Sequence, residues 1–107
     1  MAEFNFPIYP DLQDKTVLIT GGGSGIGASF VKAFVRQGCQ VAFIDIQEDA
    51  SQELVVKFPS AGSPPVFINC DLTDITALKK SVKQVEQDLG AVRVLVNNAA
   101  NDQRHEP

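Results

Sequence analysis

The chain has 107 residues, a length typical of one small domain. Hydrophobic residues make up 44% and charged residues 21%, so a folded core is expected rather than disorder. The formal net charge is −4, and the basic residues are scattered singly apart from the pair Lys79 and Lys80. Because a nucleic-acid surface needs clustered Lys and Arg, this composition argues against a nucleic-acid partner.

The cysteines and the apolar segments bear on the cellular compartment. Cys39 and Cys70 fit no metal-binding or redox spacing, so we expect reduced thiols and no metal site. The opening segment lacks the basic part and the apolar run of a signal peptide. No stretch approaches the roughly 18 apolar residues of a membrane span. The sequence therefore predicts a soluble, cytoplasmic protein without a membrane partner.

Four short apolar runs predict buried strands, and they lie at 16–20, 41–45, 66–69 and 92–96. Since helical patterns separate them, the strands are expected to pair in parallel through right-handed crossovers. The sequence thus predicts the N-terminal part of a Rossmann-type doubly wound α/β fold, with about four strands in the order 3-2-1-4 and three helices. Residues 1–13 are expected to form an irregular arm before this domain at 14–107.

The helices are predicted from apolar spacing and from their terminal residues. The first helix follows the glycine cluster and ends at Gly38. Its residues expected to face the core are Ile26, Phe30, Ala33 and Phe34. The second covers 48–58, with Leu54, Val55 and Phe58 inward. The third, capped by Thr73 or Asp74 and ended by Gly90, has the clearest stripe, namely Ile75, Leu78, Val82, Val85 and Leu89.

A glycine-rich loop lies between the first strand and the first helix. Backbone N–H groups at a helix start lack internal partners and attract phosphate, and glycine lets a pyrophosphate approach closely. This context favours a dinucleotide site over a turn without ligand. No Lys-Ser/Thr pair follows, which argues against a nucleoside triphosphatase, whereas the loop alone leaves a methyltransferase open. The expected cofactor contacts here are Gly21, Ser24, Gly25, Ile26 and Gly27.

Asp45 ends the second strand, 24 residues after Gly21. At that position of a dinucleotide site a carboxylate accepts hydrogen bonds from the adenosine ribose. It would repel a 2′-phosphate, and its neighbours Ile44, Ile46 and Gln47 offer no compensating cation. We therefore expect NAD rather than NADP as the cofactor. The alternative is a solvated carboxylate at a strand end.

Two further polar segments follow the third and fourth strands. Asp71 can accept a hydrogen bond from an adenine amino group or can cap the following helix, and both interpretations stay open. The amides of Asn97 and Asn98 can bridge neighbouring strand ends, while small residues after them leave room for a cofactor. The expected cofactor contacts in these segments are Asp71, Leu72, Asn98 and Ala99.

Together these residues resemble the short-chain dehydrogenase/reductase family. Its pattern T-G-x-x-x-G-x-G matches Thr20, Gly21, Gly25 and Gly27, its strand-end acids match Asp45 and Asp71, and its N-N-A-G matches 97–100 with Ala100 replacing glycine. The resemblance runs from Ile8 onward and argues against the methyltransferase. It implies an NAD-dependent oxidoreductase that transfers hydride between NAD and an alcohol or carbonyl. It also implies a full-length parent that forms a homodimer or homotetramer.

A closer likeness is to the bacterial sugar dehydrogenases of this family. It is carried by Ile8-Tyr9-Pro10, the loop TGGGSGIG, Arg36-Gln37-Gly38 and the segment 101–105. Those enzymes oxidise an aldose such as xylose to its lactone, so the resemblance implies a sugar as the small-molecule substrate. Arg104 or His105 could touch this substrate or could lie in a solvated loop.

The family performs its proton chemistry with a Ser and a Tyr-x-x-x-Lys motif. The single tyrosine here, Tyr9, is followed four residues later by Gln13, so we assign no catalytic residue. The chain is therefore expected to be truncated before the catalytic segment and to be inactive alone. Two alternatives remain: a non-catalytic dinucleotide-binding module, and a family member acting on another substrate such as 3-oxoacyl chains.

Overall fold

The computed structural model describes residues 9–23, 25–58 and 63–98. Its strands are β1 (Thr16–Thr20), β2 (Gln40–Asp45), β3 (Val66–Asn69) and β4 (Val92–Asn97). Its helices are α1 (Gly25–Arg36), α2 (Glu48–Val56) and α3 (Ile75–Leu89), and a short 3₁₀ helix, η1 (Pro10–Leu12), precedes β1. The strands form one parallel sheet in the order β3-β2-β1-β4, which confirms the predicted fold class and strand order.

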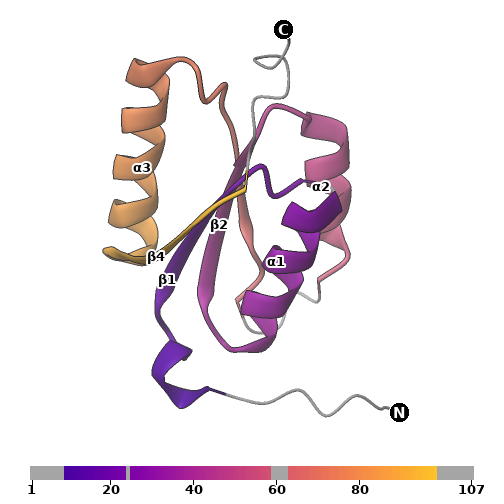
Figure 1. Ribbon diagram of the computed structural model, residues 1–107, viewed down its shortest axis with the longest axis vertical. Coiled ribbons are helices and arrows are strands. Elements are labelled where there is room, and N and C mark those ends of the chain that lie inside the picture. Colours follow the sequence, from indigo (N-terminus) through magenta and orange to yellow (C-terminus); the bar gives the residue numbers. More distant parts are fainter. Residues whose placement is uncertain (1–8, 24, 59–62, 99–107) are drawn as a thin grey trace, which may run out of the picture.

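The helices lie on both faces of this sheet. Figure 1 shows α1 and α2 on one face and α3 on the other. The chain moves outward from β1 to β3 through right-handed crossovers, so α1 and α2 share a face. It then returns to the other side of β1, and this change of direction puts α3 on the opposite face. In open parallel sheets such a reversal of strand order, here between β1 and β4, opens a crevice at the carboxyl ends of the strands.

Side chains alternate along the strands and fill a core on each face. Val17, Ile19 and Phe43 belong to the core under α1 and α2. Leu18 and Ile44 belong to the core under α3. All residues of β1 are buried, as expected for a strand with a neighbour on each side and helices on both faces.

The inward face of α1 differs from the prediction. Val31 is fully buried and Phe34 packs against the core. In contrast, Ile26 is 70% exposed, Phe30 is 37% exposed, and Ala33 is exposed as well. The cause is Gly27, which is buried at the start of the helix and fixes the orientation of the first turn. Hydrophobicity alone gives no weight to a glycine. The apolar spacing therefore predicts a stripe that lies about one residue away from the stripe that is buried.

The inward faces of α2 and α3 agree better with the prediction. Leu54 is buried, and Val55 and Phe58 pack against the core. In α3, Val85 is buried and three of the other predicted residues, Leu78, Val82 and Leu89, pack against the same core, but Ile75 is exposed because it begins the helix. Of the two predicted caps, Asp74 accepts from the Ala77 N–H at 3.1 Å.

The segment before β1 packs at the amino ends of the strands. Leu12 contacts the core, and its carbonyl accepts from the Cys39 thiol at 3.2 Å. The N–H of Tyr9 donates to Oε1 of Gln37 at 2.8 Å. Burial raises the pKa of the Cys39 thiol. Both cysteines are free thiols, as expected from the sequence, and both are buried.

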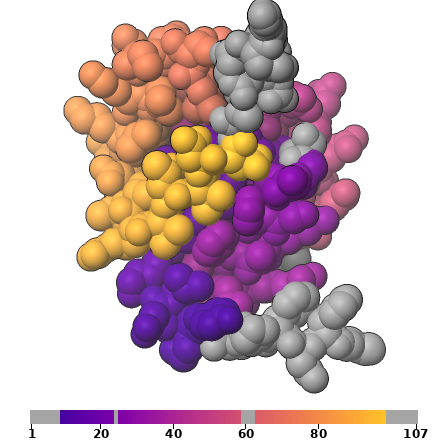
Figure 2. Space-filling model, viewed as in Figure 1, coloured from indigo at the N-terminus to yellow at the C-terminus, as the bar shows by residue number. Residues whose placement is uncertain are grey.

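The fourth strand borders the surface of the described part of the chain. Figure 2 shows β4 in yellow between α3 and α1. Its Leu95 is 60% exposed on the face that α3 shares, while Val94 and Val96 pack on the α1 side. The sheet is therefore covered more fully over β1 and β2 than over β4.

A pair of substitutions tests which face of α1 is buried. Val31→Ala removes two methyl groups from the core and should lower the free energy of unfolding by about 2 kcal/mol. Ile26→Ala shortens an exposed side chain and should change it by no more than about 0.5 kcal/mol. Urea unfolding followed by circular dichroism measures both. A larger loss from Ile26→Ala would contradict the packing described here.

Candidate functional site

The carboxyl ends of all four strands meet at one edge of the sheet. Thr20 pairs with Ile44 on one side and with Asn97 on the other, and Asp45 pairs with Asn69. The loops that follow β1, β2, β3 and β4 therefore emerge together. This edge contains all the predicted site residues that the structure describes.

The loop from β1 to α1 turns sharply at its first glycine. Gly21 has a φ of 71°, and its N–H donates to the Ile44 carbonyl at 2.7 Å, so the backbone stays attached to β2 while it turns. Gly25, the first residue of α1, has a φ of 59°. A Cβ at Gly25 would meet nothing within 4 Å, so this helix start is open to an approaching group. Both positions favour glycine because L side chains are strained there.

Gly27 allows the first turn of α1 to pack directly on the end of β1. A Cβ built at Gly27 would overlap the Gly21 carbonyl oxygen and would lie 2.8 Å from Nδ2 of Asn98. The carbonyl belongs to the backbone and cannot move aside. The helix start, with N–H groups that have no carbonyl partner within the helix, is thereby held beside the strand end.

A hydrogen-bond network joins β1 to β4. The Thr20 hydroxyl accepts from the Asn98 N–H and lies 3.0 Å from Oδ1 of Asn97, to which it donates. The Asn98 side chain donates from Nδ2 to the Gly21 carbonyl at 3.1 Å. The two asparagines thus bridge neighbouring strand ends, as their position in the sequence indicated. Asn98 reaches the glycine loop itself, whereas Asn97 braces the strands.

The Asp45 carboxylate is partly buried and held by two backbone groups. Its Oδ2 accepts from the Gly23 N–H at 2.9 Å, and its Oδ1 accepts from the Gln47 N–H at 2.9 Å. A carboxylate has about four acceptor positions, so each oxygen retains capacity for another donor. The first turn of α2 adds two more acidic residues, Glu48 and Asp49. The edge beyond β2 is therefore negative, and Asp45 itself has a fixed orientation.

Asp71 follows β3 and is held by one residue. Its Oδ1 accepts from the Thr73 hydroxyl at 2.7 Å and from the Thr73 N–H at 2.9 Å. The hydroxyl bond is the larger of the two effects that lower the pKa of Asp71 below its usual value. Since Asp74 caps α3, Asp71 closes the turn before the helix rather than capping it. Oδ2 of Asp71 stays available at an exposed position.

The remaining predicted contacts divide into three groups. Ile26 is exposed beside the open helix start, and Leu72 packs partly into the core under α3. Ser24 and Ala99, as well as Arg104 and His105, lie outside the described residues. The prediction did not include Gly23, which contacts Asp45, although a third consecutive glycine in the loop was a visible signal.

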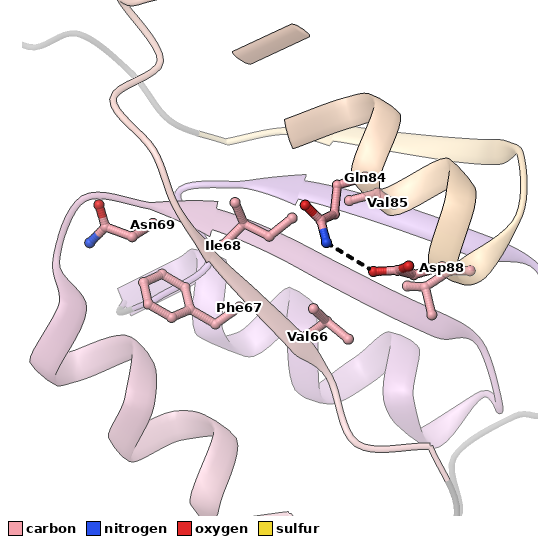
Figure 3. Close-up of a pocket in the computed structure, with 8 residues that line it drawn as sticks. Val66, Phe67, Ile68, Asn69, Gln84, Val85 and Asp88 are labelled. Carbon is pink, nitrogen blue, oxygen red and sulfur yellow. Dashed lines mark hydrogen bonds between the residues drawn. The ribbon is translucent and has the colours of Figure 1, made fainter. Parts of the chain in front are cut away.

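A separate hollow lies between β3 and α3. Figure 3 shows it, and its volume is about 330 Å³. Its lining is mostly apolar, with Val66, Ile68 and Val85 among the residues. The polar side chains Gln84 and Asp88 hydrogen-bond to each other at 3.3 Å. Neither the glycine loop nor Asp45 or Asp71 lines this hollow, so we do not assign it the function.

Two features are absent from the described ranges. Over residues 9–23, 25–58 and 63–98, no group of three or more His, Cys, Asp or Glu side chains could hold a metal ion. Within the same ranges, no helix is long and apolar enough to cross a membrane.

The parallel strands, the reversal beside β1 and the glycine loop at a helix start define a Rossmann-type nucleotide-binding domain. Comparison with known families makes the assignment specific. The family model for short chain dehydrogenases matches residues 15–107, and the chain belongs to that family. The predicted family is therefore confirmed. Its members are oxidoreductases that use NAD or NADP.

Several relatives have names that refer to sugars. The chain is 50% identical over 97 residues to a Rhizobium meliloti protein named "Probable galactose dehydrogenase", covering 90% of this chain and 38% of the relative. It is 48% identical over 98 residues to a D-xylose 1-dehydrogenase of Caulobacter vibrioides, with coverage of 92% and 38%. The chain therefore spans less than half the length of these relatives.

A solved structure supports the fold. The crystal structure of 2-keto-3-deoxy-D-gluconate dehydrogenase from Streptococcus agalactiae superposes with a TM-score of 0.75 at 34% identity. The match covers 84% of this chain and 34% of that one. The chain thus corresponds to about a third of a dehydrogenase of known structure.

The hydrogen bonds of Asp71 make a prediction about pH. Thr73→Ala removes the hydroxyl donor and should raise the pKa of Asp71 toward its usual value. A lowered pKa stabilises the folded state above the pKa of the unfolded chain, and this stabilisation is lost as the pH falls through the folded-state pKa. In the variant the folded-state pKa of Asp71 should lie closer to its unfolded-state pKa. The loss of stability on acidification should therefore be confined to a narrower pH range.

The pH titration of the Asp71 carboxyl carbon by NMR measures this change. Thr76→Ala is the matched control, because Thr76 is exposed in the first turn of α3. It should leave the Asp71 titration unchanged. An Asp71 pKa that is the same in the Thr73→Ala variant and in the unmodified chain would contradict the assigned hydrogen bonds.

Proposed function

We propose that this chain binds NAD at the carboxyl edge of its sheet and supplies the cofactor-binding part of a dehydrogenase that oxidises a sugar to its lactone. The observation that carries this proposal is the orientation of Asp45. Its two oxygens each accept one backbone N–H, and both keep room for a hydroxyl donor. A ribose diol is such a donor.

The glycine loop fits the pyrophosphate of a dinucleotide. The space around Gly25 is open, and the N–H groups of the first turn of α1 carry partial positive charge. Gly27 keeps this turn against β1, and Asn98 fixes the Gly21 carbonyl, so the N–H groups face the crevice in a fixed position. The loop would therefore bind phosphate without rearrangement.

The negative edge beyond β2 favours NAD over NADP. A 2′-phosphate on the ribose would approach Asp45 and the acidic first turn of α2, and like charges at such distances repel. The residues beside Asp45 in sequence are Ile44 and Ile46, which supply no cation. Further along this edge, the free oxygen of Asp71 would accept a hydrogen bond from the adenine amino group. The side chain of Leu72 would cover the adenine ring.

Catalysis requires groups that the 107 residues do not contain. When bound, NAD accepts hydride from the substrate carbon, and a base must take the hydroxyl proton. In this family a Tyr-x-x-x-Lys motif supplies the base, and this sequence has no such motif. We therefore propose that the chain holds the cofactor and that the proton chemistry belongs to a full-length parent, cytoplasmic and dimeric or tetrameric.

The sugar substrate is proposed from the names of the two relatives that are about half identical to this chain. Both names refer to aldoses, and the matches cover 90% and 92% of this chain. Two other functions compete with it: a dinucleotide-binding module without activity, and a dehydrogenase of another substrate class such as 3-oxoacyl chains. A substrate screen on the parent separates the last of these from the sugar.

Substitutions at Asp45 test the cofactor preference. Asp45→Ser should weaken NAD binding and narrow the preference over NADP, and Asp45→Ser with Ile46→Arg should reverse it, because a cation would then face the 2′-phosphate. Ile46 is exposed and next to Asp45, so the arginine can be accommodated. Titration calorimetry with both cofactors measures the ratio of dissociation constants.

Asp11→Ser is the matched control for the change in charge. Asp11 is exposed in η1, which precedes β1 and lies at the end of the sheet opposite to the carboxyl edge. It should affect the ratio by no more than about twofold, as expected for a distant, solvent-screened charge. Equal affinity of the unmodified chain for NAD and NADP would contradict the role given to Asp45.

The chain alone should show no dehydrogenase turnover with D-xylose or D-galactose, since no base is available for the hydroxyl proton. NADH absorbance measures this after purification from a host that lacks sugar dehydrogenases. Turnover that co-purifies with the chain through every chromatographic step would contradict the proposal that the chain holds only the cofactor and lacks the catalytic base.

A further inference from the structure

Gly23 lies at a point where the glycine loop meets both β2 and α2. Its N–H donates to Oδ2 of Asp45 at 2.9 Å, and the residue is buried. A Cβ built at Gly23 would overlap the Ser51 hydroxyl oxygen and would lie 2.9 Å from Oδ2 and 3.2 Å from Cγ of Asp45. Any side chain at Gly23 must therefore displace Asp45 or Ser51.

Ser51 forms the buried side of this contact. It lies in α2, is 0% exposed, and its hydroxyl has no hydrogen-bond partner among the described residues. A buried hydroxyl without a partner costs desolvation free energy, so its position here reflects packing rather than hydrogen bonding. Being fully buried, Ser51 cannot touch a cofactor. Of the groups around Gly23, the one that is exposed enough to move away is the Asp45 carboxylate.

We propose that Gly23 is a positioning residue for cofactor selection: it has no side chain, so that its N–H can hold the Asp45 carboxylate toward the ribose while Ser51 closes the space behind it. This inference rests on the proposed function and extends it. A residue larger than glycine would push the carboxylate away from the ribose, weaken NAD binding and remove the repulsion of a 2′-phosphate. With glycine at position 23, the loop would contribute to cofactor selection through a residue that need not contact the phosphates.

The contact with Ser51 allows a test by double substitution. Gly23→Ala should lower the ratio of the NADP and NAD dissociation constants about tenfold, a change expected when a hydrogen-bonded carboxylate is displaced. Ser51→Ala alone should leave the ratio unchanged, because Ser51 does not reach the cofactor. In the double variant the hydroxyl that opposes the new methyl group is gone, so much of the original ratio should return.

Gly38→Ala serves as the control for a general loss of stability. Gly38 has a φ of 82° and lies before β2, at the end of the sheet opposite to the glycine loop. Alanine is strained there, yet the ratio should not change. All variants are prepared in the 107-residue chain and titrated calorimetrically with NAD and NADP.

The outcomes separate the inference from the function on which it rests. Suppose that the chain binds NAD but that Gly23→Ala leaves the ratio of the NADP and NAD dissociation constants unchanged, or that Gly38→Ala changes it equally. Either result overturns the role of Gly23 and leaves the proposed function intact. A ratio that falls in Gly23→Ala and does not recover in the double variant overturns the part given to Ser51. If the unmodified chain binds neither nucleotide, the proposed function fails, and the inference fails with it.

A second measurement needs no nucleotide. The Gly23 amide proton should resonate downfield in the unmodified chain and move upfield in Asp45→Ala, because the charged acceptor is lost. An amide proton that does not respond to Asp45→Ala would show that the carboxylate is not held by Gly23, and would overturn the inference whatever the binding data.

Discussion

The close packing of the first turn of α1 on the end of β1 is the constraint on which the carboxyl edge depends. The helix can approach because Gly27 has no Cβ, which would otherwise overlap the Gly21 carbonyl. That carbonyl also accepts from Asn98, so the same contact attaches β4 to the loop. The N–H groups of the helix start are held in one place because the backbone around them cannot relax. A larger residue at Gly27 would affect the helix, the loop and the β4 attachment together.

The reversal of strand order divides the edge into two sides with different chemistry. Beyond β2 and β3 lie carboxylates whose orientation is set by neighbouring N–H and hydroxyl donors, as in Asp45 and Asp71. Beyond β4 lie the amides of Asn97 and Asn98, which hydrogen-bond to Thr20 and the glycine loop. In the proposed function the acidic side receives the adenosine and the loop receives the phosphates. Each side is built from contacts within this chain, so the proposed function needs only the part that corresponds to about a third of a dehydrogenase.

The sequence predicted the features that depend on local pattern. The bounds of β1 and β3 were predicted to the residue, because apolar runs of the right length are flanked by polar or proline-containing segments. The bridging role of Asn98 followed from its place at a strand end beside the loop.

Other features depend on contacts between distant segments and could not be predicted from pattern. The buried stripe of α1 contains Gly27, which hydropathy ignores, so Ile26 and Phe30 were assigned to the wrong face. Ile75 continued the apolar spacing of α3 but begins the helix and is exposed. The donors that orient Asp45 belong to Gly23 and Gln47, and only the folded backbone brings Gly23 within 2.9 Å of that carboxylate.

Mapping of NAD binding by backbone amide shifts tests the central claim most directly. The assigned 107-residue chain is titrated with NAD, and the amides that move are located on the structure. Binding at the carboxyl edge predicts shifts in the loop at 21–27 and at Asp45, Asp71 and Asn98, with little change at Gly38 or in the hollow between β3 and α3. Shifts confined to that hollow, or no shifts at NAD concentrations well above those at which dehydrogenases bind it, would contradict the site.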